Sequence, residues 1–523
     1  MNGVGKMRRI GMTFLALGLL LAMVGSVSAE EIDRIREKCE ELASKVEGAW
    51  YEALGMGGKS QMDRVHRDYA YLLGTVKVQQ VAGLVAKVTD PAERARQQKT
   101  LNFLKEQTIW ASVAPTLDNY LDYVKNASIT VGDKDLIFRR FWETLRQTPD
   151  QSERRILYLA GKELITNANV YLLNVEIDLD EYSKPLGIDN YYDFIAEAHG
   201  WDRDGMTALA KAILEGTDAE YTALMETMSQ KVLGMELKRV RAFDAPYLLA
   251  QPHLDDVFPV NNLESMVSDA MGHIGFKLND KKYLRTDFKD REGKDPQAHT
   301  FSIENDRNTR ITMIPDGGVD DYRAYMRKMG EALYYYDINN KLPFEDRYLG
   351  LPIMSMVFGD FMISLMNEPA WINKNLHLKE SQMADYQEAM RFMRLYELRE
   401  AAGMYLFQLK IHQDTKTSMK EYTQQMEEAT KIIQTGNEEA FYLLSNDRFL
   451  SGGRLMAAAI EPYMRKKIIE DAGAEWYSNK RTGKFLDVVA NEGFTKRYDA
   501  WAQEWGAATI DATLLLQELK AAN

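Results

Sequence analysis

Histidine and cysteine, the side chains that most often bind transition metals, are few in this sequence of 523 residues, with seven histidines and one cysteine. No two of its seven histidines lie at metal-ligand spacing on one predicted helix, and the nearest approach to a cluster is His253 with Asp255 and Asp256 in an irregular, proline-rich segment. The sequence has no glycine-rich phosphate loop, Gly-x-Ser-x-Gly turn or Walker lysine. The charged pair that stands out is Arg327 and Glu331, four residues apart and therefore able to pair along one helix face.

These two charges belong to a stretch, residues 316–372, that predicts two helices joined by a structured loop. Apolar residues recur at steps of three and four in the first helix, residues 320–338. They are Tyr322, Met326, Met329, Leu333 and Tyr336. The second helix, residues 353–367, is apolar on nearly every side, so we expect it to be buried.

The order of short motifs in this stretch resembles one family, the zinc peptidases (gluzincins) that include angiotensin-converting enzyme, thimet oligopeptidase and the bacterial oligoendopeptidases. The matching residues follow without a gap: Gly317-Gly318, Asp321-Tyr322, Leu342-Pro343-Phe344, Arg347-Tyr348-Leu349-Gly350 and Pro369-Ala370-Trp371. Further matches extend the resemblance over roughly residues 150–515. The resemblance implies a mainly α, two-lobed peptidase-like fold with a cleft and a small β-hairpin or short sheet beside the first helix.

The metal site is where the sequence departs from the family pattern. The resemblance implies an H-E-x-x-H helix and a distant glutamate that bind Zn²⁺, with the first glutamate activating water. Here the first histidine position is Arg327, the base position is Lys328, the second histidine position is Glu331 and the third-ligand position is Met356. Because arginine stays protonated and lysine has the wrong charge for the base, we expect that zinc is lost, with no other cofactor, and that no residue is catalytic.

A salt-bridge network is expected to replace the metal as the link between the two helices. Asp360, one turn after Met356, falls where the resemblance implies a carboxylate that supports the metal ligands in converting-enzyme-like members. We hypothesise that Arg327 bridges to Glu331, to Asp360 or to both. The alternative is that Arg327 and Lys328 point to solvent.

Residues 290–314 predict the strands that would hold a peptide. Gly293, Lys294, Pro296 and Ala298 match a family turn, and the resemblance implies that an edge strand lining the cleft follows it. Two alternating, β-branched segments, residues 300–304 and 309–314, predict short strands. The candidate peptide-binding residues are Thr309, Arg310, Ile311, Thr312, Met313 and Ile314. The alternative is a hairpin that only supports the helix.

The remainder of the chain predicts helices without a flexible linker, divided into an N-terminal helical lobe, residues 30–250, and a peptidase-like lobe, residues 251–523. One exception is the segment from Val175 to Tyr182, whose alternation indicates a short strand or a turn. Its four acidic residues lack the spacing of a calcium-binding loop and are typical of a solvated face.

Residues 1–29 have the pattern of a secretory signal peptide. Lys6, Arg8 and Arg9 precede an apolar run, and the small residues before Glu30 predict cleavage after Ala29. The alternative is an uncleaved anchor, although the apolar run is shorter than the ~20 residues of a spanning helix. We therefore expect a periplasmic or secreted bacterial protein.

Composition narrows the classes of partner. Removal of the three positive signal residues from a formal charge of −13 leaves −16, so neither nucleic acid nor anionic lipid is an expected partner. No later stretch is expected to be long and apolar enough for stable membrane insertion. Cys39 is the only cysteine, which excludes a disulfide within the chain.

Two functions are compatible with these features. The first is an exported, non-catalytic peptidase homologue (a pseudopeptidase) that binds a peptide or protein partner in the inherited cleft. The second is a metallo-oligopeptidase or peptidyl-dipeptidase whose metal site is rearranged or completed by a partner chain. Loss of all the ligand positions and the base together favours the first.

Overall fold

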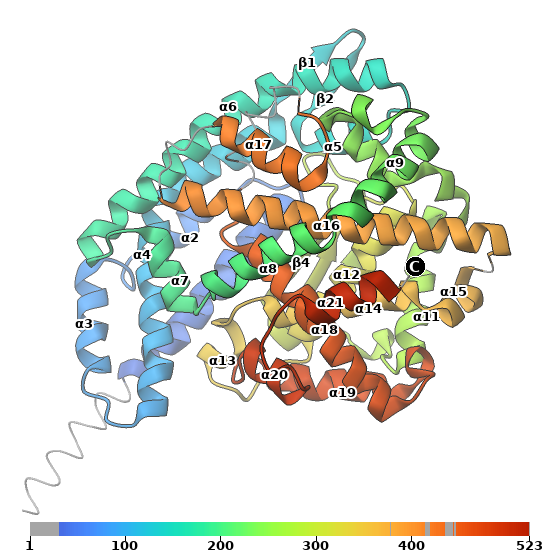
Figure 1. Ribbon diagram of the computed structural model, residues 1–523. Helices are drawn as coiled ribbons and strands as arrows, with labels where there is room; N and C mark the ends of the chain where they lie inside the picture. The colour runs from blue at the N-terminus through green and yellow to red at the C-terminus, as the bar shows by residue number, and fades with distance from the viewer. Residues whose placement is uncertain (1–30, 377, 414–418, 435–442, 444–445, 522–523) are drawn as a thin grey trace, which may run out of the picture.

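The computed structural model describes residues 31–521 except for residue 377 and residues 414–418, 435–442 and 444–445 (Figure 1). The predicted signal peptide, residues 1–29, lies outside the described residues. Helices dominate the described chain, and the strands form one two-stranded and one three-stranded sheet. This confirms the predicted mainly α fold with a short sheet.

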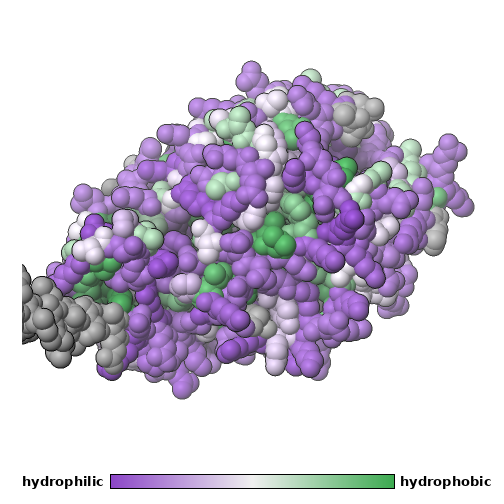
Figure 2. Space-filling model, turned by 90° about the horizontal axis from the view of Figure 1, so that it is seen from below, coloured by the Kyte–Doolittle hydropathy of each residue, from purple (hydrophilic) through white to green (hydrophobic). Residues whose placement is uncertain are grey.

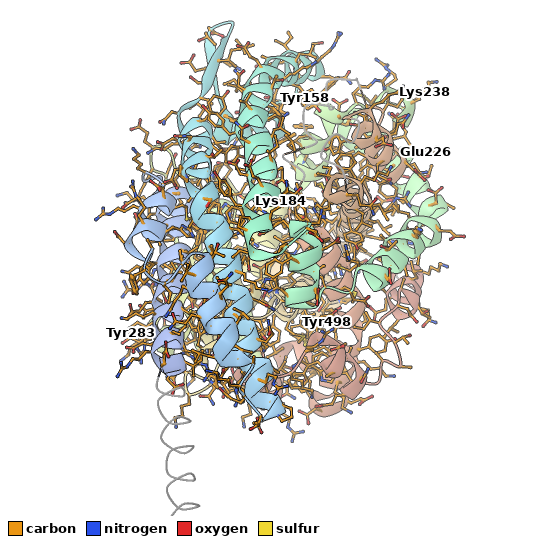
Figure 3. The ribbon with its side chains drawn as sticks, turned by 90° about the vertical axis from the view of Figure 1, so that its left-hand side faces the viewer. Tyr158, Lys184, Glu226, Lys238, Tyr283 and Tyr498 are labelled. Carbon is orange, nitrogen blue, oxygen red and sulfur yellow. The ribbon has the colours of Figure 1, made fainter. Side chains whose placement is uncertain are left out.

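Two long helices, α4 (Pro91–Asn126) and α6 (Gln151–Ser183), run side by side along one flank of the molecule, as Figures 1 and 3 both show. Each begins at an aspartate that caps it: Asp90 accepts from the N–H of Glu93, and Asp150 from that of Glu153. The first helix, residues 31–50, continues into the π-helical turn η1 (Tyr51–Gly55). The shorter helices of this part are α2 (Met62–Asp68), α3 (Thr75–Val85), α5 (Phe141–Arg146), α7 (Tyr191–His199), α8 (Arg203–Gly216) and α9 (Asp218–Leu233).

The prediction of a strand or turn between Val175 and Tyr182 is wrong, because α6 continues to Ser183. Val175 and Leu179 are both buried and lie four residues apart, which is the spacing of one helix face. The same apolar residues therefore fit a period of 3.6 as well as a period of two. Burial against the core decides in favour of the helix.

The second part of the chain supplies the helices around the candidate site. They are α10 (Ala245–Ala250), α11 (Leu263–Ile274), α12 (Val319–Tyr336), α13 (Phe344–Tyr348), α14 (Ile353–Asn367), α15 (Pro369–Leu376), α16 (Glu380–Gln413), α17 (Met419–Thr430), α18 (Leu450–Ala472), α19 (Lys480–Asn491), α20 (Tyr498–Glu504) and α21 (Thr513–Ala521). As predicted, the helix at residues 353–367 is buried: α14 packs against α12 and α18. Gly330 allows the close approach of α12, since a Cβ there would lie 2.4 Å from the Phe358 carbonyl oxygen.

By length and composition the stretch Phe344–Asn367 is apolar enough to cross a membrane, so the expectation that no later stretch would meet those measures is wrong. In the structure this stretch forms α13 and α14, separated by residues 349–352. Most of its apolar window is buried inside the protein. Packing in the core accounts for its composition.

The three-stranded sheet lies against α12. It consists of β3 (Leu284–Asp287), β4 (His299–Glu304) and β5 (Asn308–Thr312), in the order β3-β5-β4, with β5 parallel to β3 and antiparallel to β4. Thr300 faces α12, where its hydroxyl donates to the Lys328 carbonyl, whereas Phe301 packs on Tyr51 of η1. A separate hairpin joins β1 (Ser128–Val131) to β2 (Lys134–Ile137).

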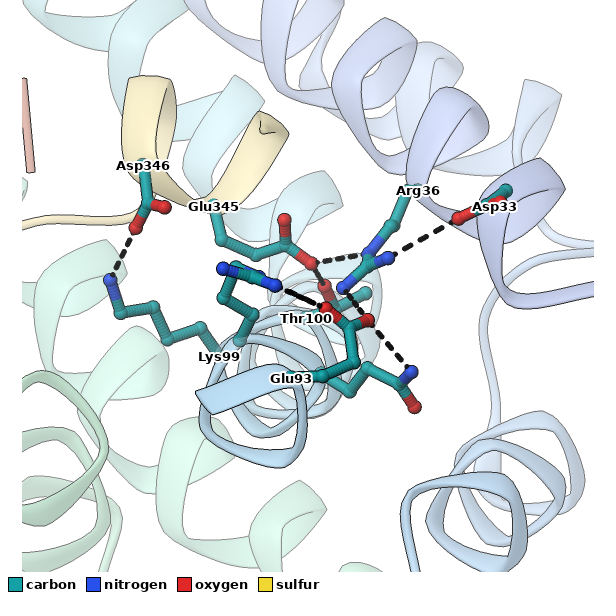
Figure 4. A network of polar contacts seen from close by, with 9 residues as sticks. Asp33, Arg36, Glu93, Lys99, Thr100, Glu345 and Asp346 are labelled. Carbon is teal, nitrogen blue, oxygen red and sulfur yellow. Dashed lines mark hydrogen bonds and ion pairs between the residues drawn. The ribbon is translucent and has the colours of Figure 1, made fainter. Parts of the chain in front are cut away.

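Charged side chains fasten the first helix to the rest of the protein (Figure 4). Arg36 pairs with the fully buried Glu345 of α13 at 2.7 Å and with Glu93 of α4 at 2.6 Å, and Glu345 also accepts from the Thr100 hydroxyl. The face seen in Figure 2 is largely hydrophilic, with small hydrophobic patches.

The largest hydrophobic core includes residues from both predicted lobes, such as Met225 and Met326. The division into two lobes near residue 250 stays a prediction.

Candidate functional site

Arg327 lies at the centre of a charge network that joins α12, α14 and α16. Its Nη2 is 2.7 Å from Oε2 of Glu397 on α16, and its Nε is 3.6 Å from Oδ1 of Asp360 on α14. Arg323, one turn earlier on α12, is 3.0 Å from the other oxygen of Glu397. Arg394 of α16 is 3.2 Å from the other oxygen of Asp360. The network thus runs Arg323–Glu397–Arg327–Asp360–Arg394 and has one more positive than negative charge.

Electrostatics keep this network ionised at neutral pH. Burial alone would raise the pKa of Glu397, but the guanidinium groups of Arg323 and Arg327 lower it to about 2. Burial likewise opposes the charge of Arg327, yet Glu397 and then Asp360 raise the pKa of its guanidinium. The Arg323 side chain is only 3% exposed, so its charge depends on Glu397.

Of the two partners predicted for Arg327, the structure contains Asp360 but not Glu331. Glu331 pairs instead with Lys328, at 2.9 Å, within the same helix. Arg327 extends across α14, where Gly359 makes room: a Cβ at Gly359 would lie 2.9 Å from Arg327 Cγ. Arg327 and Lys328 therefore both have carboxylate partners, so the alternative prediction that they only point to solvent is wrong.

The side chains at the positions where the resemblance places zinc do not fit that metal. The Arg327 guanidinium cannot be a metal ligand, and the Lys328 ammonium is bound to Glu331. The Met356 thioether, which lies beside Gly453 of α18, is a weak ligand for zinc. Within the described part of the chain, no group of three or more His, Cys, Asp or Glu side chains is arranged to hold a metal ion. This arrangement joins α12, α14 and α16 through charge.

The structure places the candidate peptide-binding segment, residues 309–314, differently from the prediction. β5 is the central strand, so β3 and β4 occupy both of its edges and its backbone has no side on which a peptide could pair. Thr309, Ile311, Thr312, Met313 and Ile314 are buried, and only Arg310 reaches a cavity. The edge strand beside α12 is β4, because the chain returns through β5 to fill the middle of the sheet.

The outer edge of β4 is partly occupied by the first helix. The Ser302 N–H points away from β5 and donates to Glu47 Oε1 at 3.2 Å. Because outward-pointing groups recur every second residue in such a ladder, the Thr300 backbone also points outward. Burial raises the pKa of the Glu47 carboxyl to about 7, against the effect of this N–H. Along this edge the backbone of Thr300 therefore points outward, whereas the outward N–H of Ser302 is bound by the Glu47 carboxyl.

A cavity of about 540 Å³ adjoins the start of β4 and separates α4, α5 and α6 from α16 and α17. Asp295 and Gln297, just before β4, line it, as do Tyr396 and Glu400 of α16 and Tyr158, which Figure 3 labels on α6. Glu400 is one turn beyond Glu397, so the cavity lies next to the charge network. A second cavity, of about 860 Å³, lies between the first helix and the turn from β4 to β5.

The sequence reasoning missed the contribution of α16. Arg394, Glu397 and Glu400 are charges at steps of three on a helix with many buried apolar residues, including Phe392, Leu395 and Leu398. Charges at helical spacing inside an apolar pattern were the signal that could have located them. Their partners on α12 and α14 are not near in sequence, so the pairing itself required the fold.

The comparisons with known proteins add no family to this geometry. Neither a protein-family model nor a curated protein matches the sequence. The resemblance to the zinc peptidases therefore rests on sequence motifs alone, those of residues 316–372 and the further matches over roughly residues 150–515.

Proposed function

We propose that the chain is an exported, non-catalytic metallopeptidase homologue that binds a peptide or protein partner in the cleft beside α12. The proposal combines the motif order described above with a site whose chemistry differs from that of a hydrolase. A zinc hydrolase needs neutral or anionic ligands and a base that can accept a proton from water. At the corresponding positions, Arg327 and Lys328 are cations in ion pairs, Glu331 is the partner of Lys328, and Met356 has a thioether.

The observation that carries the proposal is the position of Arg327 between Glu397 and Asp360. Arg327 is held by carboxylates from two other helices, and the resemblance would assign a first metal ligand to its position, where this chain has a permanent positive charge. The same network fixes α12 against α14 and α16 without a metal. Ion pairs therefore join these three helices at the degenerate site.

Two features near the charge network support binding, the edge strand β4 and the cavity next to Glu400. A peptide that pairs with the outward backbone of Thr300 would extend toward Gln297 and the cavity of about 540 Å³. That volume falls within the ~300–1,000 Å³ typical of ligand pockets. The predicted peptide contact therefore moves from β5 to β4.

The test measures metal content, hydrolysis and binding on one preparation. The exported chain is purified without a metal-binding tag, its zinc is measured by plasma mass spectrometry, and fluorescent extended peptides are tested for cleavage and binding. We expect zinc well below one atom per chain, no cleavage, and binding that Met404→Trp abolishes by filling the cavity. The matched control is Ile177→Trp on the exposed face of α6, which should leave binding unchanged.

The opposite result supports the alternative function. Near-stoichiometric zinc together with hydrolysis that a chelator abolishes would mean a rearranged or partner-completed metal site, and the pseudopeptidase proposal would be wrong. Absence of binding for every peptide and protein fraction tested would also contradict the proposal.

A further inference from the structure

The cavity beside β4 has aromatic walls and a carboxylate, Glu400, that forms no ion pair with a residue the structure describes. Its aromatic lining comes from both sides: Tyr120, Phe138, Trp142 and Tyr158 from the N-terminal part, and Tyr396 and Tyr422 from α16 and α17. Arg139 is the cation of the lining, and it donates to the carbonyl oxygens of Ala53 and Gly293. Aromatic faces and a carboxylate are the groups that bind an organic cation.

Glu400 differs from the other deep carboxylates of this region. Glu397 and Asp360 each contact two arginines, whereas Glu400 forms no ion pair within the part of the chain that the structure describes. Its contact is the Tyr396 hydroxyl, which donates to Oε1 at 3.3 Å. Arg454 of α18 lowers its pKa from a distance without forming an ion pair. A cationic group of a ligand would therefore give this buried carboxylate the opposite charge that stabilises it.

Two carboxylates, Glu400 and Asp295, line the cavity. Asp295, across the cavity, adds a second carboxylate and pairs with His299 at 3.3 Å. Burial raises the pKa of Glu400 to about 7, which the Tyr396 hydroxyl and Arg454 oppose and Glu397 reinforces. Burial thus favours the protonated carboxyl near neutral pH, and a bound cation would favour its ionised form.

We infer that the cavity accepts the cationic side chain of a bound peptide, a lysine or an arginine, with the charge at Glu400 and the alkyl stem along the aromatic walls. This inference rests on the proposed function, because the peptide is the ligand that carries the side chain. Pairing with β4 would bring alternate side chains of the peptide to the same face. One of them would point from Gln297 into the cavity, so specificity would reside at a single peptide position.

The experiment uses fluorescent alanine hexapeptides with one varied position that is moved along the peptide. The varied residue is lysine, arginine, norleucine or glutamate, and Kd is measured by anisotropy at pH 8. We expect lysine and arginine at one position to bind at least about tenfold more tightly than norleucine, as one hydrogen-bonded charge pair can provide. Glutamate should bind most weakly.

Two variants and one pH change complete the design. Glu400→Gln should remove the preference for lysine while norleucine peptides bind as before, and Glu388→Gln, on the outer part of α16, should change neither. Because Glu400 titrates near pH 7, the preference should shrink between pH 8 and pH 6; a melting curve verifies that each variant is folded.

The outcomes separate this inference from the function on which it rests. Equal binding of lysine and norleucine peptides, or an unchanged preference in Glu400→Gln, would refute the inference that the cavity binds a cationic side chain at Glu400. Peptide binding itself would stand. Failure of every peptide to bind overturns both.

Discussion

Replacement of Glu397 by glutamine is the most direct test of the charge network, because one carboxylate serves two arginines. The substitution retains the size of the side chain and removes its charge. Arg323 and Arg327 would then lie one turn apart on α12 with neutral oxygen or nitrogen atoms between them. Arg327 would retain Asp360, at 3.6 Å, but Arg323 would lose the ion-pair partner seen in the structure.

The magnitude follows from burial. Removal of one partner from a buried pair costs about 3–5 kcal/mol. The Glu397 side chain is 32% exposed, so water at the cleft reduces that figure, whereas Arg323 is only 3% exposed and cannot be hydrated in place. We expect a loss of about 2–4 kcal/mol in the free energy of unfolding. Arg327→Ala should cost less, about 1–2 kcal/mol, because Arg323 and Arg394 still neutralise the two carboxylates.

The assay is urea unfolding at several pH values. The pKa of Glu397 is lowered in the folded protein to about 2, so its stabilising effect is present above pH 4–5 and is lost as pH falls toward 2. The difference between wild type and Glu397→Gln should therefore shrink as the solution is acidified through that window. A change below about 0.5 kcal/mol at pH 7, which is the size of an ordinary surface substitution, would refute the network as a structural link.

Three further perturbations test other parts of the fold. Gly330→Ala should destabilise the protein by about 1–3 kcal/mol in thermal or urea unfolding, because its Cβ would meet the carbonyl of α14. The control Gly83→Ala in α3, whose Cβ would meet no packed neighbour within 4 Å, should stabilise the protein by about 0.5–1 kcal/mol. Equal effects of the two substitutions would contradict the close approach of α12 and α14. Glu345→Gln should cost about 2 kcal/mol in urea unfolding and release the first helix to faster proteolysis, since Arg36 loses its buried partner (Figure 4); an unchanged cleavage rate would argue against that attachment. The raised pKa of Glu47 means that its ionisation opposes folding as pH rises from about 4.5 to 7, so wild-type stability should decline over this range and Glu47→Gln should flatten the decline; parallel stability curves for the two proteins would contradict the burial of this carboxyl.

Local patterns predicted the elements of the candidate site well. The stripe from Tyr322 to Leu333 is buried in α12, and the apolar segment from Ile353 to Asn367 is the core helix α14. These patterns succeed because the buried face of a helix has apolar residues at steps of three and four in the sequence. The pairing of Arg327 with Asp360 was also predictable once the two helices were placed together.

Features that depend on tertiary contacts were not predictable from the sequence. The segment at residues 309–314 has the alternation of a strand, but alternation does not tell a central strand from an edge strand. That distinction requires β3, which lies more than twenty residues earlier and joins β5 in parallel. Likewise, Glu397 is seventy residues from Arg327, so no spacing rule within one helix connects them.

The contact between Glu47 and Ser302 also bears on how copies of this protein meet one another. An uncovered strand edge is a template on which a second molecule can add a strand, and such growth leads to aggregation. Glu47 takes up the N–H of Ser302 and puts a carboxylate where a neighbouring carbonyl would have to approach. Because burial raises the pKa of this carboxyl to about 7, protonation weakens the repulsion in acid. The protein should accordingly remain dispersed longest in mildly alkaline solution and self-associate through β4 as the pH falls.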